Sequence, residues 1–220
     1  MSIEEVKCFQ IDPNKEPKQI IYEGKHIADA DLLRMITKSE YFLENYNFYS
    51  EQKEILLPSE PIEITEQAIK NFISIFQVEE FQINESIIFQ LYYLSIKYKV
   101  QNLTKLIYNY IIANNQKLVI GLLNYKMEIQ DLPNYDELNI NIDKDDEIRI
   151  ISSNLINFIN NNEFLSLPIN ILCLIFENYF KDNYFSLEIS NFFFNYLLKY
   201  KQNAFVLFSY IRFNSIHELI

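Results

Sequence analysis

Histidines and paired carboxylates are the residues of this chain whose types could support general acid–base chemistry. The sequence holds two histidines, His26 and His217, and neither has a serine, cysteine or carboxylate partner at a recognisable spacing. A catalytic histidine is oriented by such partners. Glu79 and Glu80 could serve a small hydrolase, but neighbouring residues on a helix point in different directions and could not flank one substrate bond. We therefore expect no catalytic residues, and the hydrolase is a remote alternative.

A run of carboxylates at Asp143, Asp145, Asp146 and Glu147 could bind calcium. A calcium loop of the EF-hand type needs a glycine at its sixth position and a bidentate glutamate at its twelfth. Counted from Asp143, the sixth residue is an isoleucine and the twelfth an asparagine. Acidic residues at a helix start interact favourably with the helix dipole. The run therefore predicts a solvated loop leading into a helix, and we expect neither a metal nor a cofactor.

Glycine is scarce, with only Gly24 and Gly121 in 220 residues. Phosphate-binding loops, nucleophile elbows and dinucleotide-binding turns all need glycines close together, because the backbone must approach a ligand or turn sharply. The sequence therefore excludes these nucleotide-binding and hydrolase motifs.

The charge balance is acidic, with 19 Lys and Arg against 30 Asp and Glu, a formal net charge of −11. Such a surface repels phosphate backbones, so we expect no nucleic-acid binding. No stretch of 18 apolar residues occurs and the acidic N-terminus has no apolar run, so we expect neither a membrane helix nor a signal peptide. Cys8 and Cys173 make no disulfide framework and are expected to be reduced core residues. These features predict a cytoplasmic or nuclear protein.

Strand signals are concentrated near the N-terminus. Residues 5–11 are β-compatible, and residues 19–27 predict a hairpin with Gly24 in its turn. A helical period follows over 29–37, and a short strand is predicted at 54–57. The first half should therefore mix strands and helices.

From residue 65 onward the apolar residues recur at helical spacing. Thr65 is a predicted N-cap and Asn84 caps the next helix, with a third helix over 103–111. Residues 127–147 contain Pro133 and eight acidic residues, which predicts a solvated linker or a long exposed loop.

After residue 145 the pattern predicts almost pure helix. One helix is expected at about 147–160, a second after Pro168, a third after Ser186 and a last one in the tail from 203 to 213.

The segment 25–49 resembles the start of a BTB/POZ domain. Such domains have a β-hairpin, a helix, and then a Ser-x-Tyr/Phe-Phe segment that enters the next helix, here Ser39-Glu40-Tyr41-Phe42. The family's usual His-x-x-Leu is replaced here by His26-Ile27-Ala28-Asp29. The ordered set covers residues 5–113 and continues with a strand at 55–57, a helix over 64–81 and a helix pair over 84–100 and 103–111.

The second half is similar to a BACK region. The similarity rests on Glu163-Phe164-Leu165-Ser166-Leu167-Pro168, on the apolar residues Ile171, Leu172 and Ile175, and on Glu188-Ile189 and Phe192 further on. Leu167-Pro168 and these apolar residues also resemble an F-box, so an F-box-like adaptor acting through residues 164–180 is an alternative.

Together the halves look like divergent protist proteins in which a BTB domain with such helices stands N-terminal to ankyrin repeats. The resemblance implies an α+β fold: a BTB/POZ-like domain over 1–113 (small sheet with helical cluster), an acidic linker with a short helix over 114–146, and an all-α BACK-like helical region over 147–220. It implies a non-catalytic protein–protein interaction module. The module would be a substrate adaptor for a cullin-type ubiquitin ligase, or a scaffold that self-associates.

Two groups of residues are the predicted partner-binding sites. The family's cullin-docking signature is a hydrophobic residue, any residue, then Glu, in the loop after the Ser-x-Tyr/Phe-Phe helix; Tyr49-Ser50-Glu51 matches it, with Phe42 before it. In the second half, Phe192, Phe193 and Phe194 are more apolar than one helix face requires, which indicates either core packing on two sides or a partner groove.

Self-association through the family's swapped N-terminal helix is not expected. In the dimeric Kelch-type and zinc-finger-type members that helix precedes the first strand, and only Met1–Glu4 precede the strand expected here. An interface helix needs three or four turns. We therefore expect a monomer in dilute solution or weak self-association, with any dimer using the aromatic helices of the second half.

Overall fold

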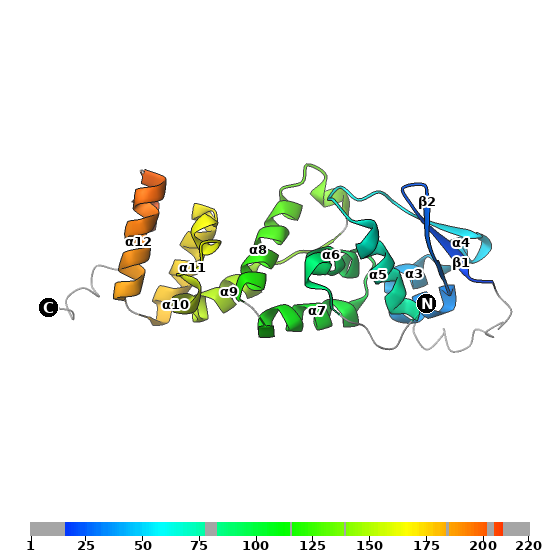
Figure 1. Cartoon of the computed structure of the whole chain (residues 1–220), viewed down its shortest axis with the longest axis horizontal. Coiled ribbons are helices and arrows are strands. Elements are labelled where there is room, and N and C mark those ends of the chain that lie inside the picture. The colour runs from blue at the N-terminus through cyan, green and yellow to red at the C-terminus, as the bar shows by residue number, and fades with distance from the viewer. Residues whose placement is uncertain are drawn as a thin grey trace. The chain divides into compact units, whose positions relative to one another are not determined.

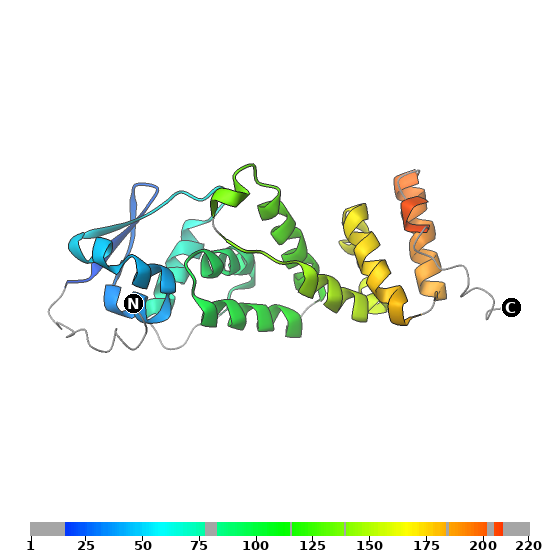
Figure 2. The same cartoon turned by 180° about the vertical axis from the view of Figure 1, so that it is seen from behind.

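The computed structural model describes residues 16–77, 83–114, 116–138, 140–183, 185–201 and 205–208. The fold is α+β, with a small mixed sheet near the N-terminus followed by a mostly helical region (Figure 1; Figure 2 from behind). The chain divides into two compact units. The first contains residues 1–110 and 131–141, and the second contains residues 111–130 and 142–220.

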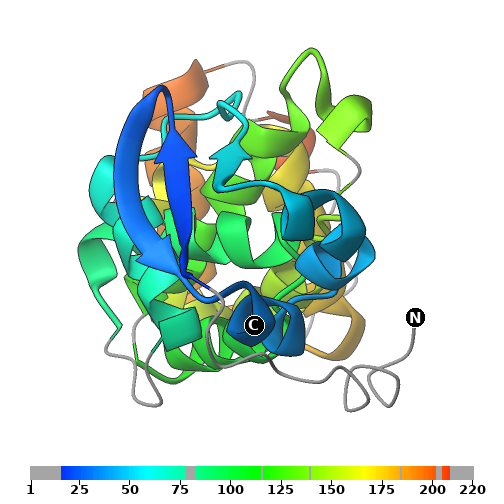
Figure 3. The same cartoon turned by 90° about the vertical axis from the view of Figure 1, so that its right-hand side faces the viewer.

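Among the residues that the structure describes, the sheet has three strands in the order β2-β1-β3 (Figure 3). β1 (Lys18–Tyr22) and β2 (Lys25–Ala30) are antiparallel, and β3 (Glu54–Leu57) lies parallel to β1. Glu23 and Gly24 join the first two strands with φ of 49° and 75°, the pair of positive angles of a tight hairpin turn. The predicted hairpin with Gly24 in its turn is confirmed, and so is the predicted strand at 54–57.

Several helices of the first unit begin at polar capping residues. The Ser39 Oγ accepts a hydrogen bond from the Phe42 amide at 3.2 Å, and the Thr65 Oγ1 accepts one from the Ala68 amide at 3.2 Å. Asn84 caps the turn before the next helix, so both predicted caps, Thr65 and Asn84, are confirmed. The elements are α2 (Leu32–Lys38), α3 (Glu40–Glu44), α4 (Tyr46–Glu51), α5 (Glu66–Gln77), η1 (Glu85–Ile87), α6 (Ile88–Lys97), α7 (Gln101–Asn114) and η2 (Tyr135–Leu138).

Aromatic rings make much of the core of the first unit. Phe42 stacks on Tyr98 with ring centroids 5.6 Å apart and meets Phe76 edge to face at 5.8 Å. Phe72 contacts both Phe76 and Tyr98. All four side chains are fully buried. The rings come from α3, α5 and the end of α6, so they hold these three helices together.

The second unit is helical throughout the residues that the structure describes, and after residue 145 those residues contain no strand, as predicted. Pro168 stands at the N-cap of α11, and the Ser186 hydroxyl caps α12. The elements are α8 (Gln116–Gln130), α9 (Asp145–Ser153), α10 (Leu155–Phe158), η3 (Phe164–Ser166), α11 (Ile169–Asp182), α12 (Leu187–Tyr200) and α13 (Phe205–Phe208).

A second aromatic cluster packs α11 against α12. Phe176 lies 5.5 Å from Phe192 and 4.9 Å from Phe193, measured between ring centroids, and Phe164 lies 5.3 Å from Phe192. Cys173, also on α11, is a buried core residue, as predicted.

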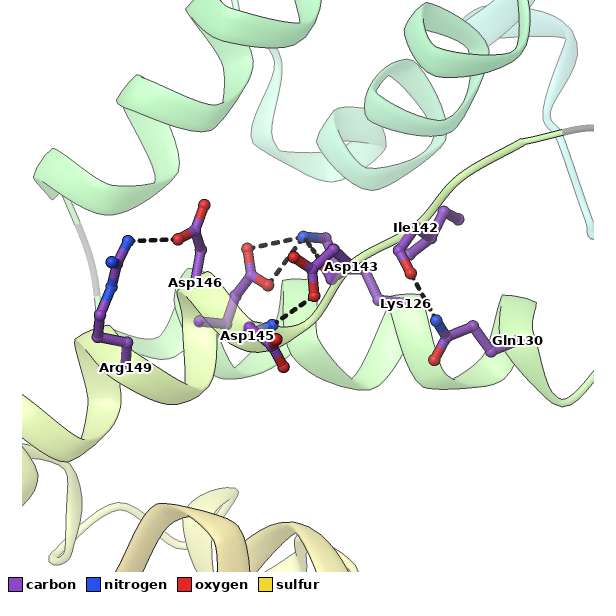
Figure 4. A network of polar contacts seen from close by, with 8 residues as sticks. Lys126, Gln130, Ile142, Asp143, Asp145, Asp146 and Arg149 are labelled. Carbon is purple, nitrogen blue, oxygen red and sulfur yellow. Dashed lines mark hydrogen bonds and ion pairs between the residues drawn. The ribbon is translucent and has the colours of Figure 1, made fainter. Parts of the chain in front are cut away.

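One buried ion pair joins α8 to α9. The Lys126 Nζ donates to both carboxylate oxygens of Glu147 at 2.9 and 2.8 Å and to the Asp143 carbonyl at 2.6 Å (Figure 4). The Lys126 side chain is 4% exposed and that of Glu147 is 0% exposed. Of the segment 114–146 that the sequence assigns to an acidic linker, α8 and residues 142–146 therefore pack in the second unit.

Several expectations fall outside the described residues. These are the strand at 5–11 with Cys8, the carboxylates Glu79 and Glu80, His217, and the tail after residue 208.

Candidate functional site

The segment predicted to dock a cullin forms two short helices. α3 follows directly from the Ser39 cap, and the Asn45 side chain donates to the Tyr41 carbonyl at 2.8 Å where α3 ends. α4 begins at the next residue, so the stretch expected to be a loop is helical. Helical geometry therefore fixes which side chains of this segment face solvent.

Two of the predicted docking residues face inward. Phe42 is fully buried and Tyr49 is 6% exposed, with their ring centroids 5.8 Å apart. The Tyr49 hydroxyl lies 3.3 Å from the Tyr41 hydroxyl, and burial raises the pKa of Tyr49 well above its ordinary value. Both buried side chains therefore anchor α3 and α4 in the core of the first unit.

The outward face of α4 carries Phe48 and Glu51. Phe48 is 64% exposed, and its ring rests edge to face on Tyr49 with centroids 5.2 Å apart. Glu51, the third predicted docking residue, is exposed and lies three residues further on the same helix face. An apolar ring beside a carboxylate is thus presented to solvent. Phe42 and Tyr49 are seven residues apart, a spacing that puts two helical residues on one face. This spacing is the sequence signal that could have placed Phe48 on the outside.

The sheet of the first unit exposes a second apolar residue. Leu56 of β3 is 64% exposed and pairs with the half-buried Ile21 of β1. His26 is the β2 partner of Ile21, and its Nε2 lies 2.9 Å from the Asp29 Oδ1 in an exposed contact. The spacing of His26 and Asp29 does not indicate this pair in the sequence, because a contact three residues along a strand departs from the alternation of side chains.

The aromatic run of the second unit is divided between core and solvent. Phe192 and Phe193 are 3% and 2% exposed and belong to the aromatic cluster, whereas Phe194 is 60% exposed. Leu187 and Leu198 on the same helix are 73% and 64% exposed. Only one of the three predicted phenylalanines is therefore available to a partner, and two leucines that the sequence analysis did not single out accompany it.

The carboxylates of the predicted acidic loop turn to different partners. Glu147 faces Lys126, Asp146 pairs with Arg149, and the Asp143 Oδ1 accepts from the Asp145 amide at 2.9 Å (Figure 4). In the part of the chain that the structure describes, no group of three His, Cys, Asp or Glu side chains is arranged to hold a metal ion.

An open polar groove of about 530 Å³ lies between α9 and α11. Its charged side chains have both signs: Arg149 and Lys181 face it together with Asp145 and Asp182. Ser152 also lines it, but the Ser152 Oγ lies 2.6 Å from the Ile148 carbonyl oxygen and 3.0 Å from the Ile175 carbonyl oxygen, which share its one proton. That hydroxyl is committed to helix packing and is not oriented as a nucleophile.

The residues that carry the F-box resemblance are core residues of the second unit. Leu167, Ile171, Leu172 and Ile175 are each at most 2% exposed. None of the helices in the described ranges is long and apolar enough to cross a membrane.

A scan of protein-family models finds none that matches this chain, and a search of the curated proteins finds no match.

Proposed function

We propose that this chain is a non-catalytic protein–protein interaction module, with a BTB/POZ-like first unit and a BACK-like helical second unit. The order of elements supports the proposal. A hairpin, α2, the Ser39-capped α3, the strand β3, and then α5, α6 and α7 follow one another as the sequence resemblance implies. The fold leaves an edge on β2 and another on β3, which are surfaces that partners can use.

The exposure of Phe48 beside Glu51 is the observation that carries the proposal. A phenylalanine that is 64% exposed leaves a large apolar area in water, and aromatic side chains are enriched where proteins meet. It stands on α4, directly after the Ser39–Phe42 segment, where the resemblance locates cullin docking. Phe48 takes the role of the hydrophobic contact, Glu51 that of the acidic one, and the buried Tyr49 holds both in place.

More specifically, the chain is proposed to be a substrate adaptor for a cullin-type ubiquitin ligase. α4 contacts the cullin scaffold, and the helical second unit is left for the recruited protein. An oligomerisation or scaffold protein without a ligase role uses the same exposed residues for other partners.

Binding of the full chain to the purified amino-terminal region of a cullin scaffold tests this function. We expect the double variant Phe48→Ala/Glu51→Ala to weaken binding by at least roughly thirtyfold, the size of a hot-spot truncation. Neither residue is buried, so circular dichroism and thermal unfolding should match those of the unchanged chain.

Leu106→Ala is the matched control, because Leu106 is a 47% exposed apolar residue on α7. It should bind like the unchanged chain. Equal binding by the α4 double variant rejects the α4 site. Absence of binding by the unchanged chain rejects the cullin partner, and the scaffold function is then tested by asking whether captured proteins are lost from the α4 variant and kept by Leu106→Ala.

A further inference from the structure

The outward face of α12 carries a stripe of exposed apolar side chains, with one exposed polar residue, Asn191, at its border. Leu187, Phe194 and Leu198 are each at least 60% exposed. At about 100° per residue, these three side chains fall within an arc of about 40° on the helix. Ile189, Phe192, Phe193 and Tyr196 are buried on the opposite side. The helix thus has two apolar faces, one packed on its own unit and one turned to solvent.

The charges of α12 lie along one flank of that stripe. Glu188 is in the first turn and Lys199 in the last, and both are exposed. At about 100° per residue, their side chains point within about 20° of each other. The stripe therefore has an acidic residue at one end and a basic residue at the other, both on the same side.

We infer that α12 binds α12 of a second copy of this chain, antiparallel and about a two-fold axis. In an antiparallel helix pair, residues on one flank meet residues on the same flank of the other helix. Leu187 then lies opposite Leu198 of the second copy, and the two Phe194 rings meet near the axis. Glu188 lies within about 3 Å along the axis of Lys199 of the second copy, at about 1.5 Å per residue.

The charge pattern favours a second copy over an unrelated partner. A two-fold axis uses the same patch twice, so each contact occurs in duplicate. The acidic end of one helix meets the basic end of the other twice, and the antiparallel helix dipoles oppose favourably. In a parallel pair one flank would face the opposite flank of the other helix, so Glu188 and Lys199 would have no charged partner across the contact.

The size of the stripe sets the strength of the contact. Stable interfaces bury about 800 Å² on each partner, and three side chains supply only part of that area. We expect a weak dimer with a Kd of roughly micromolar or higher, because standard-size interfaces begin at about that affinity. The chain is then a monomer in dilute solution. The inference concerns a different helix from α4 and does not depend on whether a cullin binds there.

Charge reversal tests the antiparallel arrangement. Sedimentation velocity of the full chain, from low micromolar to several hundred micromolar, measures its self-association. Glu188→Lys and Lys199→Glu should each weaken self-association by roughly five- to twentyfold, because two attractive pairs become repulsive. The double variant Glu188→Lys/Lys199→Glu should restore it. An equimolar mixture of the two single variants should associate more tightly than either alone, because every pair across the axis is again attractive.

Apolar substitutions test the stripe itself. Leu198→Asp should abolish self-association, and Leu174→Asp should leave it unchanged, because Leu174 is a 44% exposed leucine on the neighbouring α11. Circular dichroism checks that each variant keeps its helix content. Three results would overturn the inference: an unchanged chain that stays monomeric at the highest concentration, equal association by Leu198→Asp, or a mixture of the single variants that associates no better than its components.

Discussion

A single hydroxyl connects two helices of the first unit. The Ser39 Oγ accepts from the Phe42 amide and donates to the Tyr98 carbonyl at 2.5 Å. Ser39 is 2% exposed, and Tyr98 is fully buried. Water therefore cannot replace the hydroxyl at either partner. The serine of the Ser-x-Tyr/Phe-Phe segment both starts α3 and fastens it to the end of α6.

Ser39→Ala should destabilise the protein by about 2 kcal/mol. The loss of an N-cap costs about 1 kcal/mol and a buried carbonyl without its donor costs about 1–3 kcal/mol. Chemical denaturation gives the free energy of unfolding. Ser50→Ala is the control, since the Ser50 hydroxyl bonds only locally to the Asn47 carbonyl on the surface and its loss should cost less than about 0.5 kcal/mol. A Ser39→Ala protein as stable as the control would contradict the role of the hydroxyl.

At the residue scale, the sequence predicts features such as helix caps, which depend on only a few neighbouring residues. Thr65 and Asn84 were identifiable as caps because a cap bonds to an amide two or three residues away. The inward direction of Tyr49 was not, because it depends on where α4 begins. α4 begins at Tyr46, directly after the Asn45 that ends α3, and no cap bond from the Asn45 side chain marks its start.

At the scale of elements, the pairing of α8 with α9 depends on a buried charge. Desolvation raises the pKa of the Glu147 carboxyl, and the nearby Lys126 ammonium partly offsets that rise. Removing one partner of a buried pair leaves an uncompensated charge, whereas replacing both by apolar residues is often neutral or stabilising. The pair therefore specifies the register of two helices more than it stabilises them.

Glu147→Gln should destabilise the protein by roughly 3–5 kcal/mol, because the Lys126 charge stays buried without its counter-ion. The double variant Lys126→Met/Glu147→Leu should recover most of that loss. Thermal and chemical unfolding of the three proteins measures both effects. A double variant as unstable as Glu147→Gln would mean that the ion pair itself supplies net stability.

The pH dependence of the same proteins gives an independent check. The folded state holds the Glu147 proton more tightly than the unfolded chain does, so this carboxyl stabilises the fold most below its ordinary pKa. Its contribution falls as the pH rises from there through the raised pKa. The difference in unfolding free energy between the unchanged chain and the double variant should fall over that range. A rise would contradict the direction of the shift.

The acidic stretch shows why composition alone did not reveal this contact. Residues 127–147 read as solvated because eight carboxylates occur in them. Seven of those carboxylates are exposed, in agreement with that interpretation. Glu147 is buried, in an ion pair with a lysine 21 residues earlier in the sequence. Helical periodicity shows that each helix has an apolar face, but it does not show which helix covers it, so α8 could not be assigned to the second unit.

At the scale of the whole molecule, the net charge of −11 opposes contact between two copies. The α12 contact is mostly apolar near its centre, where Asn191 borders the stripe, and it carries attractive pairs only at its ends. The long-range repulsion between the two net charges therefore opposes the local attraction between the charged pairs, and salt screens these two interactions to different extents.

Self-association should tighten several-fold when ionic strength rises from about 0.1 M to about 1 M, as the Debye length falls from about 10 Å to about 3 Å. The gain from screening the net charge exceeds the loss at two exposed pairs, while the apolar centre is unaffected. Sedimentation equilibrium measures the change. Lys199→Glu is the comparison, because its net charge is two units more negative and its pairs are repulsive, so salt should tighten it more. Weaker association of the unchanged chain at high salt would show that the local pairs dominate.

The parallel pairing of β1 with β3 has a consequence for the order in which the first unit assembles. Ile20 of β1 pairs with Ile55 of β3, which lies 35 residues later in the sequence. The chain between these residues must therefore fold back before β3 can pair with β1. The β1–β2 hairpin closes over two residues and forms on the microsecond scale without β3. β3 can add its edge only after α2, α3 and α4 have folded into a connection of the right length. We therefore expect completion of the sheet to be a late event that reports the docking of those helices, and a fragment ending before residue 54, which lacks β3, to hold the hairpin only marginally.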